Sequence, residues 1–366
     1  MDLKRITIIG LGLMGGSLAK ALKTRVPVRE IFAVDCSLEP INQAIAEGVI
    51  DKGFHSMESP VLESDIIFIC TPIKKTFEYI NQMEGKVNKN CIITDIGSTK
   101  DDIIKYINKM LNPPVFIGGH PMTGTEKTGY SFSVAHLFEN AYYILTPSKT
   151  TTPESIRLMT YIIHAIGAIP ITLESDHHDA IVGTISHVPH IIASALVHLV
   201  KDSDRSEGLM KLLAAGGFKD ITRIASSGAE MWENIVLSNK DEIKGILQSF
   251  LQIIQKFGHF LDQEESGKVY EFFKNAKHYR DSFPCTRKGT IPPLFEIAVD
   301  VMDKPGILGK IATLLGNNHI NIKNMNISNS REGEQGCLRI TLPCNDSMDK
   351  AYYLLNIEGY KVHKVL

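Results

Sequence analysis

Cysteine is sparse in this sequence and follows no pattern. The six cysteines are scattered along 366 residues, and none belongs to a Cys-x-x-Cys pair. Such a distribution argues against a zinc knuckle and against a dithiol redox motif. We therefore expect reduced, structural cysteines and no metal site, since a thiol within an apolar run behaves as a small hydrophobic group.

An excess of charge of either sign is also absent, and so is any long hydrophobic run. The formal net charge is −2, which provides no electrostatic attraction toward nucleic acid or an anionic membrane. The apolar segment at residues 6–16 is interrupted by glycines, and no later apolar run reaches membrane-spanning length. These absences predict a cytoplasmic protein whose partners are small molecules and other protein chains, with neither nucleic acid nor membrane among them.

What the sequence does contain is typical of a folded protein with several domains. Hydrophobic residues make up 43% of the chain and charged residues 22%, without an internal repeat or a low-complexity segment. The length leaves room for two or three domains, each with its own core.

The first part of the chain, residues 1–172, is expected to be an α/β domain. Short apolar runs alternate there with helical patterns such as 15–23 and 99–109, which predicts a parallel sheet covered by helices. The expected strands are residues 5–9, 30–34, 65–70, 91–95, 115–118, 141–145 and 168–172.

The pattern changes after residue 172. Residues 173–282 show helical periodicity, including one long amphipathic segment at 237–260, and they predict an all-α domain. A segment rich in proline and glycine at 283–293 predicts a linker. Residues 294–366 then follow the order β-α-β-β-α-β, which predicts a small α+β domain of the ferredoxin-like type.

A glycine-rich motif, Gly10-Leu-Gly12-Leu13-Met14-Gly15, follows the first expected strand and begins the first expected helix. In that context Gly10 allows a tight turn, Gly12 lets backbone amides approach a pyrophosphate, and Gly15 allows close packing of the helix. The N-terminus of the helix also favours the phosphate charge. The motif predicts a Rossmann-type dinucleotide-binding domain.

Further residues at the carboxyl ends of the strands point to the cofactor. Asp35 ends the second strand, 20 residues after Gly15, where its carboxylate can accept hydrogen bonds from ribose hydroxyls. The three residues after it include no arginine for a 2′-phosphate, so we expect NAD rather than NADP. Thr71, Pro72 and Ser98 follow other strands and are expected to face the cofactor. Ser98 has a second interpretation, as the N-cap of the next helix.

Three other motifs carry side chains suited to catalysis or substrate binding. His120 lies in a Gly-Gly-His-Pro turn after a strand, where an imidazole can take a proton from a hydroxyl as a hydride leaves the same carbon. Arg223, among small residues, suits capture of a carboxylate, with a surface ion pair as the alternative. His187 and His190 lie three apart on a helix that Pro189 distorts. Without a third ligand at a suggestive spacing, substrate contact or core hydrogen bonding is favoured over a metal.

Together these motifs resemble the prephenate dehydrogenase family, in the form with a carboxyl-terminal ACT regulatory domain. The resemblance rests on GLGLMGGSLA near the start, DIGSTK at 95–100, GGHPMTGTEKTG at 118–129, SHVPH at 186–190 and GGFKDITRIASS at 216–227. It implies NAD-dependent oxidative decarboxylation of prephenate to 4-hydroxyphenylpyruvate, in tyrosine biosynthesis. It also implies that the helical domain forms a homodimer or a higher homo-oligomer.

The resemblance further implies roles for individual residues. His120 would accept the proton of the ring hydroxyl, Ser98 would orient it, and Arg223 would bind a substrate carboxylate. The other residues that the resemblance places around the substrate are Thr125, His190, Ser227, His187, Lys219, Asp220 and Trp232.

The stretch Asp303-Lys-Pro-Gly306-Ile-Leu308, together with Asn321, resembles the ligand loop of ACT domains. The resemblance implies an amino-acid effector site lined by Asp303, Gly306 and Asn321, with L-tyrosine as the expected inhibitor. A purely structural dimerisation module is the alternative.

Three other functions stay open from the sequence. Arogenate (cyclohexadienyl) dehydrogenases perform the same ring chemistry on a substrate with an amino group in place of the keto group. The β-hydroxyacid dehydrogenases share the GLGxMG motif and use a helical-domain lysine, for which Lys219 would be the candidate, but the setting of His120 argues against them. An NAD-dependent sensor would lack a base and a carboxylate anchor, and both His120 and Arg223 are present.

Overall fold

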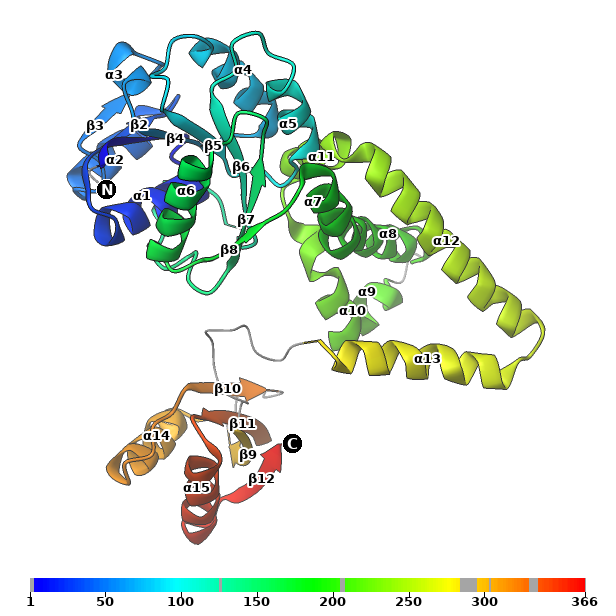
Figure 1. The fold of residues 1–366 in the computed structure, drawn as a ribbon. Helices are drawn as coiled ribbons and strands as arrows, with labels where there is room; N and C mark the ends of the chain where they lie inside the picture. Colours follow the sequence, from blue (N-terminus) through cyan, green and yellow to red (C-terminus); the bar gives the residue numbers. More distant parts are fainter. Residues whose placement is uncertain are drawn as a thin grey trace. The chain divides into compact units, whose positions relative to one another are not determined.

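The computed structural model describes residues 3–124, 127–204, 208–283, 295–302, 304–328 and 335–365. The chain divides into two compact units, Met1–Val269 and Tyr270–Leu366. The first contains the expected α/β domain and most of the helical domain, and the second contains the small α+β domain (Figure 1). The linker expected at 283–293 falls, apart from residue 283, outside the described residues.

An eight-stranded sheet forms the centre of the first unit. Its strands are β1 Leu3–Ile9, β2 Val28–Val34, β3 Lys52–Phe54, β4 Ile66–Ile69, β5 Ile92–Asp95, β6 Val115–Pro121, β7 Tyr142–Pro147 and β8 Ile169–Thr172. They lie in the order β3-β2-β1-β4-β5-β6-β7-β8, so the strand order reverses between β1 and β4. In such sheets ligands bind at the carboxyl ends of the strands, at this switch point. The observed order confirms the Rossmann-type fold.

The expectation of a parallel sheet is wrong for the last two strands. Strand β7 runs antiparallel to β6, and β8 runs parallel to β7. In the described part of the connection from β6 to β7, the only helical element is the 3₁₀ turn Tyr130–Phe132. Without a crossover helix, the chain returns beside β6 in the opposite direction. The sequence also does not predict β3, because three residues are too few to show a strand pattern.

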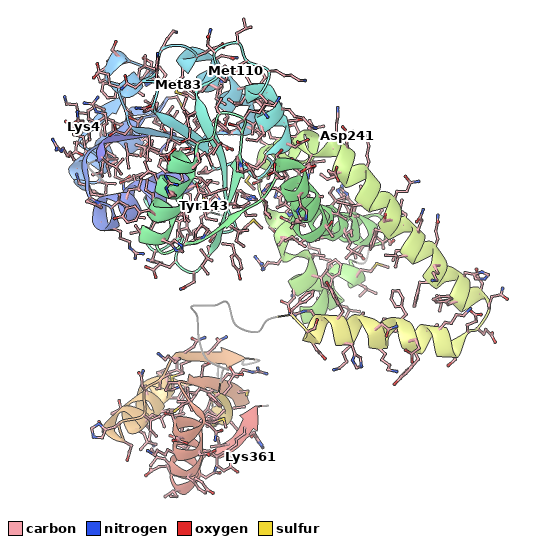
Figure 2. All side chains as sticks on the ribbon, in the orientation of Figure 1. Lys4, Met83, Met110, Tyr143, Asp241 and Lys361 are labelled. Atoms are coloured by element: carbon pink, nitrogen blue, oxygen red, sulfur yellow. The ribbon has the colours of Figure 1, made fainter. Side chains whose placement is uncertain are left out.

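Helices cover both faces of this sheet (Figure 1). Buried apolar side chains fill the space between the layers, among them Tyr143 on β7 (Figure 2). The strand ends therefore remain the edges at which loops can bind ligands. The helices of one face are α1 Leu13–Arg25, α2 Leu38–Ala46 and α6 Pro153–Ala165, and those of the other are α3 Ser59–Leu62, α4 Ile73–Met83 and α5 Asp101–Ile107.

The remainder of the first unit is helical, as predicted. One expectation is wrong, because the single helix expected at 237–260 is broken at Asn239. The buried amide of Asn239 donates to the carbonyl oxygen of Asp179 at 2.9 Å, a contact between distant residues that periodicity does not reveal. The helices are α7 Ser175–Val182, α8 Val188–Ser203, α9 Leu209–Leu213, α10 Gly216–Thr222, α11 Ala229–Ser238 and α12 Lys240–Asp262, and the chain continues in α13 Ser266–Asp281.

A π-helical turn, Gly183–His187, joins α7 to α8 into one continuous segment, Ser175–Ser203. Pro189 has no backbone N–H and cannot donate the hydrogen bond of a regular α-helix to this turn. Its position therefore fits the wider geometry of a π-helical turn. Contrary to the expectation from the sequence, this segment is long and apolar enough to cross a membrane by length and composition. Its buried His178 and Asp179 nevertheless hydrogen-bond to β6 and to the start of α5, as in a core helix of a folded domain.

The second unit contains a four-stranded antiparallel sheet in the order β10-β11-β9-β12. Two helices pack on it around one apolar core. The element order β-α-β-β-α-β confirms the ferredoxin-like arrangement predicted for this region. The elements are β9 Phe295–Met302, α14 Ile307–Asn317, β10 Asn324–Ser328, β11 Gln335–Leu342, α15 Asn345–Ile357 and β12 Lys361–Val365.

Candidate active site

The glycines after β1 differ in what surrounds them. Gly10 has a φ of +95°, and a Cβ there would lie 2.7 Å from the carbonyl oxygen of Cys70. A Cβ on Gly15 would overlap the carbonyl oxygen of Gly10, so packing requires glycine at both positions. A Cβ on Gly12, the N-cap of α1, would meet no described atom within 4 Å. This open space at the positive end of α1 fits the pyrophosphate of a dinucleotide.

The carboxylate of Asp35, expected to bind the ribose, lies beside this glycine loop. Its Oδ2 accepts a hydrogen bond from the backbone N–H of Leu11 at 2.7 Å, and its Oδ1 accepts one from the N–H of Ser37 at 2.8 Å. A carboxylate has about four acceptor positions, so these two bonds leave it able to accept from hydroxyl groups as well.

The other residues expected at the cofactor are close to the same strand ends. Leu13 and Met14 form the first turn of α1, and Pro72 is the N-cap of α4. Thr71 follows β4, and its γ-methyl group would lie 3.0 Å from a Cβ on Gly10. The buried Oγ1 of Thr71 has no hydrogen-bond partner among the described residues. Because buried polar atoms normally have a hydrogen-bond partner, a ligand bound at this edge of the sheet would provide one for Thr71 Oγ1.

The carboxylate of Asp95 joins the loop after β5 to strand β6. Its Oδ2 accepts from the N–H of Gly97 at 2.8 Å, and its Oδ1 accepts from the N–H of Gly119 at 3.2 Å. Fully buried Lys100 forms an ion pair with the same carboxylate. Burial lowers the pKa of Lys100, although Asp95 opposes the shift. Removing one partner of such a buried pair lowers protein stability by about 3–5 kcal/mol. The pair therefore contributes to holding the loop after β5 against strand β6.

His120 lies within β6 rather than in the expected turn after it. The strand continues through Pro121, because both residues pair with β7. The side chain is buried, with 9% of the residue exposed. Burial lowers the pKa of His120 well below its ordinary value, and the nearby His178 and Lys100 lower it further. His120 is therefore neutral near pH 7, in the form that can accept a proton.

Two residues that the sequence analysis does not single out complete this cluster. His178 Nε2 lies 2.8 Å from His120 Nδ1, and His178 Nδ1 lies 2.6 Å from Asp179 Oδ1. Both residues are buried on α7. The only signal in the sequence is a histidine next to an aspartate on a predicted helix, and periodicity does not show that this helix packs against β6.

The interpretation of Ser98 as a helix N-cap is wrong. The N-cap of α5 is Lys100, and the first amides of the helix, those of Lys100 and Asp101, donate instead to Asp179 at 2.8 and 2.9 Å. Ser98 lies half-buried in the preceding loop. The hydroxyl of the next residue, Thr99, lies 2.9 Å from that of Ser238 at the end of α11. These contacts attach the loop to the helical domain.

His187 and His190 pack around the one tryptophan, Trp232. The ring of His190 stacks on it with centroids 3.5 Å apart, and the ring of His187 meets it edge-on at 6.1 Å. His187 Nδ1 accepts a hydrogen bond from Asn239 Nδ2 at 3.1 Å. Burial lowers the pKa of His187 to about 4, although Asp179 opposes the shift. No group of three or more potential metal ligands occurs in the part of the chain that the structure describes.

A pocket lies between α8, the 3₁₀ turn Arg223–Ser226 and α11, and it brings together two expected substrate contacts, His190 and Ser227. Lys219 and Asp220 on α10 and Arg223 on the turn are exposed and do not line it. Thr125 lies outside the described residues. The lining residues are His190, Ile191, Ser194, Ala195, His198, Ala225, Ser227, Ala229, Trp232, Glu233 and Val236.

Two of the three expected effector residues are described in the second unit. Gly306 is the N-cap of α14 and has a φ of +89°, a left-handed conformation that favours glycine. Asn321 is exposed in the loop after α14. Asp303 lies outside the described residues.

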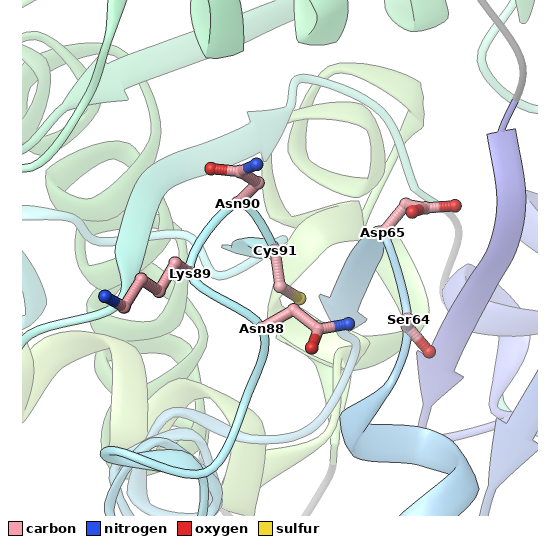
Figure 3. Close-up of a pocket in the computed structure, with 6 residues that line it drawn as sticks. All are labelled: Ser64, Asp65, Asn88, Lys89, Asn90 and Cys91. Carbon is pink, nitrogen blue, oxygen red and sulfur yellow. The ribbon is translucent and has the colours of Figure 1, made fainter.

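Another hollow lies near the amino ends of β4 and β5, at the opposite end of the strands from the glycine loop (Figure 3). Its acidic group, Asp65, accepts hydrogen bonds from the backbone N–H groups of Lys4 and Arg5 at 2.6 and 2.9 Å. This carboxylate therefore anchors β1 and does not form part of a catalytic set. The lining residues are Ser64, Asp65, Asn88, Lys89, Asn90 and Cys91.

The chain matches three protein-family models. Residues 18–171 match the model described as "Prephenate dehydrogenase, nucleotide-binding domain". Residues 174–275 match "Prephenate dehydrogenase, dimerization domain", and residues 295–351 match "ACT domain".

Individual relatives agree with these matches. The chain is 38% identical over 348 residues to the prephenate dehydrogenase of Bacillus subtilis (strain 168), with 94% of each chain covered. It is 33% identical to the prephenate dehydrogenase of Lactococcus lactis subsp. cremoris, covering 95% of this chain and 96% of that one. A crystal structure of prephenate dehydrogenase from A. aeolicus with hydroxyphenyl propionate and NAD+ is 30% identical, has a TM-score of 0.73, and covers 78% of this chain and 99% of its own.

Proposed function

This chain belongs to the prephenate dehydrogenase family of NAD-dependent oxidoreductases, and from that premise we propose that it converts prephenate to 4-hydroxyphenylpyruvate by oxidative decarboxylation. Relatives of that name match nearly the whole chain, which disfavours the arogenate alternative. The structural observation that most directly supports the activity is His120, a buried neutral imidazole at the end of β6.

The proposed reaction takes a hydride from the ring carbon that bears the hydroxyl group and a proton from the hydroxyl oxygen. Bound NAD supplies the acceptor for the hydride. His120 accepts the hydroxyl proton, which a neutral imidazole can do near pH 7. The bond to the ring carboxylate then breaks with release of carbon dioxide, and its electron pair completes the aromatic ring. The protonated His120 returns its proton to the ring oxygen, which becomes the phenolic hydroxyl of the product. The protein therefore has mainly to position the substrate and hold its carboxylates.

The residues present fit the cofactor. The open space at Gly12 would receive the pyrophosphate at the start of α1, with Gly10 and Gly15 shaping the turn. Asp35 would accept from the ribose hydroxyls, and the unpartnered hydroxyl of Thr71 would gain a hydrogen bond. The other residues proposed to contact the cofactor are Leu13, Met14, Pro72 and Ser98.

The substrate is proposed to lie between the end of β6 and the helical domain. Arg223 is the proposed anchor for a carboxylate, since a guanidinium binds one through two parallel hydrogen bonds. Ser98, in the loop held by the Asp95 carboxylate through Gly97, is proposed to orient the hydroxyl group. The pocket lined by His190 and Ser227 supports their roles as further contacts. The remaining proposed contacts are Thr125, His187 and Lys219.

We also propose a cytoplasmic homodimer formed through the helical domain. The match to a dimerization domain over residues 174–275 supports the assembly. Helices in this region expose large apolar side chains, as contact surfaces between protein chains do. Among them, Leu199 is 63% exposed, Leu212 76%, Leu213 74% and Ile221 62%.

The ACT domain is proposed to bind L-tyrosine and to inhibit the enzyme. Its match over residues 295–351 supports an amino-acid module, and the N-terminus of α14, after Gly306, can attract a carboxylate as helix N-termini do. Asp303 and Asn321 are proposed to hold the ammonium group. An effector can alter activity only if it binds one conformational or assembly state better than another, and a coupling of about 1–3 kcal/mol is sufficient.

Absorbance of NADH tests the proposed activity. The purified chain is incubated with prephenate or arogenate, each with NAD and with NADP. We expect turnover with prephenate and NAD. Turnover with arogenate alone would move the assignment to the arogenate dehydrogenases, and a preference for NADP would contradict the role given to Asp35.

A further inference from the structure

Three buried side chains at the end of β6 form an unbroken row of hydrogen-bonding groups. His120 Nδ1 lies 2.8 Å from His178 Nε2, and His178 Nδ1 lies 2.6 Å from Asp179 Oδ1. His178 and Asp179 are at most 2% exposed. Because the row is shielded from water, each donor must be matched by an acceptor within it.

The row ends at the carboxylate of Asp179, which only accepts hydrogen bonds. Asp179 Oδ1 accepts from the N–H of Lys100 at 2.8 Å, and Asp179 Oδ2 accepts from the N–H of Asp101 at 2.9 Å. An ionised carboxylate has no proton to donate. The proton between Asp179 and His178 is therefore on His178 Nδ1.

That assignment determines the rest of the row. A neutral imidazole carries one N–H, so His178 Nε2 has a lone pair and must accept from His120 Nδ1. His120 then carries its proton on Nδ1 and leaves Nε2 bare. A doubly protonated His178 would instead donate from Nε2 and reverse this direction, and NMR of ¹⁵N-histidine distinguishes the two arrangements.

We propose that His178 is a positioning residue, which, through its hydrogen bond to Asp179, fixes the tautomer of His120 so that Nε2 is the proton acceptor. The proposal rests on the proposed role of His120 as the base and extends it. A free neutral histidine can carry its proton on either ring nitrogen, and only one of the two forms presents a lone pair at Nε2.

Three variants of the full chain test the proposal. His178→Leu removes both ring nitrogens with a small change in volume. His178→Gln keeps the direction of the row, because its amide can donate to Asp179 and accept from His120. His177→Leu is the matched control, since His177 is the preceding residue on α7 and is exposed.

Two measurements are made on each protein. NMR of ¹⁵N-histidine in the full chain reports which ring nitrogen of His120 carries the proton, with the signals assigned by their loss in His120→Asn. Steady-state kinetics with NAD and prephenate give kcat and both KM values. In wild type and His177→Leu we expect the proton on Nδ1. In His178→Leu we expect that preference to be lost and kcat to fall at least about tenfold, with the KM for NAD unchanged. His178→Gln should restore both properties.

A proton on Nε2 of His120 in the wild-type chain would overturn the proposal. So would a His178→Leu variant with wild-type kcat and the proton still on Nδ1. If His178→Leu does not fold, the wild-type spectrum and the recovery in His178→Gln decide the question. Absence of NAD reduction by the wild-type chain would instead refute the proposed function, and the NMR result would still test the tautomer.

Discussion

At the scale of single residues, His120 should control how the reaction depends on pH. His120→Asn removes the proton acceptor, so kcat should fall about 10²- to 10⁴-fold with little change in the KM for NAD. Because burial lowers the pKa of His120 well below 6.5, the base stays unprotonated as the pH falls through 6.5, and kcat should decline only at lower pH. A pH profile of kcat measures this, and the decline should vanish in His120→Asn. Wild-type kcat in that variant would remove His120 from the mechanism.

Arg223 should act on substrate binding. Arg223→Ala removes a charge-assisted hydrogen bond to a carboxylate, worth about 1.5–3 kcal/mol, so the KM for prephenate should rise about ten- to a hundredfold. Arg157→Ala is a suitable control, because Arg157 is an exposed arginine on α6 paired with Glu154. Steady-state kinetics with saturating NAD make the comparison. An unchanged KM in Arg223→Ala would return Arg223 to the role of a surface ion pair.

At the scale of elements, substitutions in the glycine loop should distinguish the glycine that binds the cofactor from the glycines that packing requires. Gly12→Ala places a Cβ in open space at an ordinary φ of −76°, so thermal stability should hold while the KM for NAD rises at least about tenfold. Gly15→Ala should unfold the domain, because its Cβ would overlap the Gly10 carbonyl. Gly245→Ala in α12 is the control, expected to add about 0.5–1 kcal/mol of stability and to leave kinetics unchanged.

Thermal unfolding and steady-state kinetics distinguish these three variants. A Gly12→Ala protein that is stable and has a wild-type KM for NAD would contradict the position assigned to the pyrophosphate. A folded Gly15→Ala protein would show that the contact between the loop and α1 can relax.

At the scale of the whole molecule, the regulatory domain should be separable from the catalytic part. Deletion of residues 294–366 should leave NADH formation largely intact and abolish inhibition by tyrosine. The separate apolar cores of the catalytic part and of the small α+β domain support independent folding. Activity with and without tyrosine, and calorimetry on the full chain, are the measurements. Failure of the full chain to bind tyrosine or to respond to it would make the domain structural, or a sensor of another ligand.

A point variant provides a control for the deletion. Gly306→Val in the full chain forces a β-branched side chain into a left-handed conformation at the start of α14. It should weaken inhibition by tyrosine while leaving basal activity near that of wild type. Equal inhibition of the variant and the wild type would remove Gly306 from the proposed effector site.

The sequence alone determined the features that depend on local pattern. The glycine motif after an apolar run predicts the turn at Gly10, because few other residues adopt its positive φ. The alternation of strands and helices predicts the Rossmann-type fold, and β-α-β-β-α-β predicts the ferredoxin-like domain. The motifs around His120 and Arg223 were sufficient to predict the family to which the chain belongs.

Features that depend on contacts between distant residues became visible in the folded structure and could not be predicted from local pattern. The direction of β7, the break at Asn239 and the cap on α5 each depend on partners far away in the sequence. The same is true of the row from His120 through His178 to Asp179, since α7 follows β6 by more than 50 residues. Periodicity reports which face of an element is apolar, but not which polar groups of another element that face meets. The protonation state of His120 follows from these contacts between elements. The chemistry of the site therefore depends on tertiary packing.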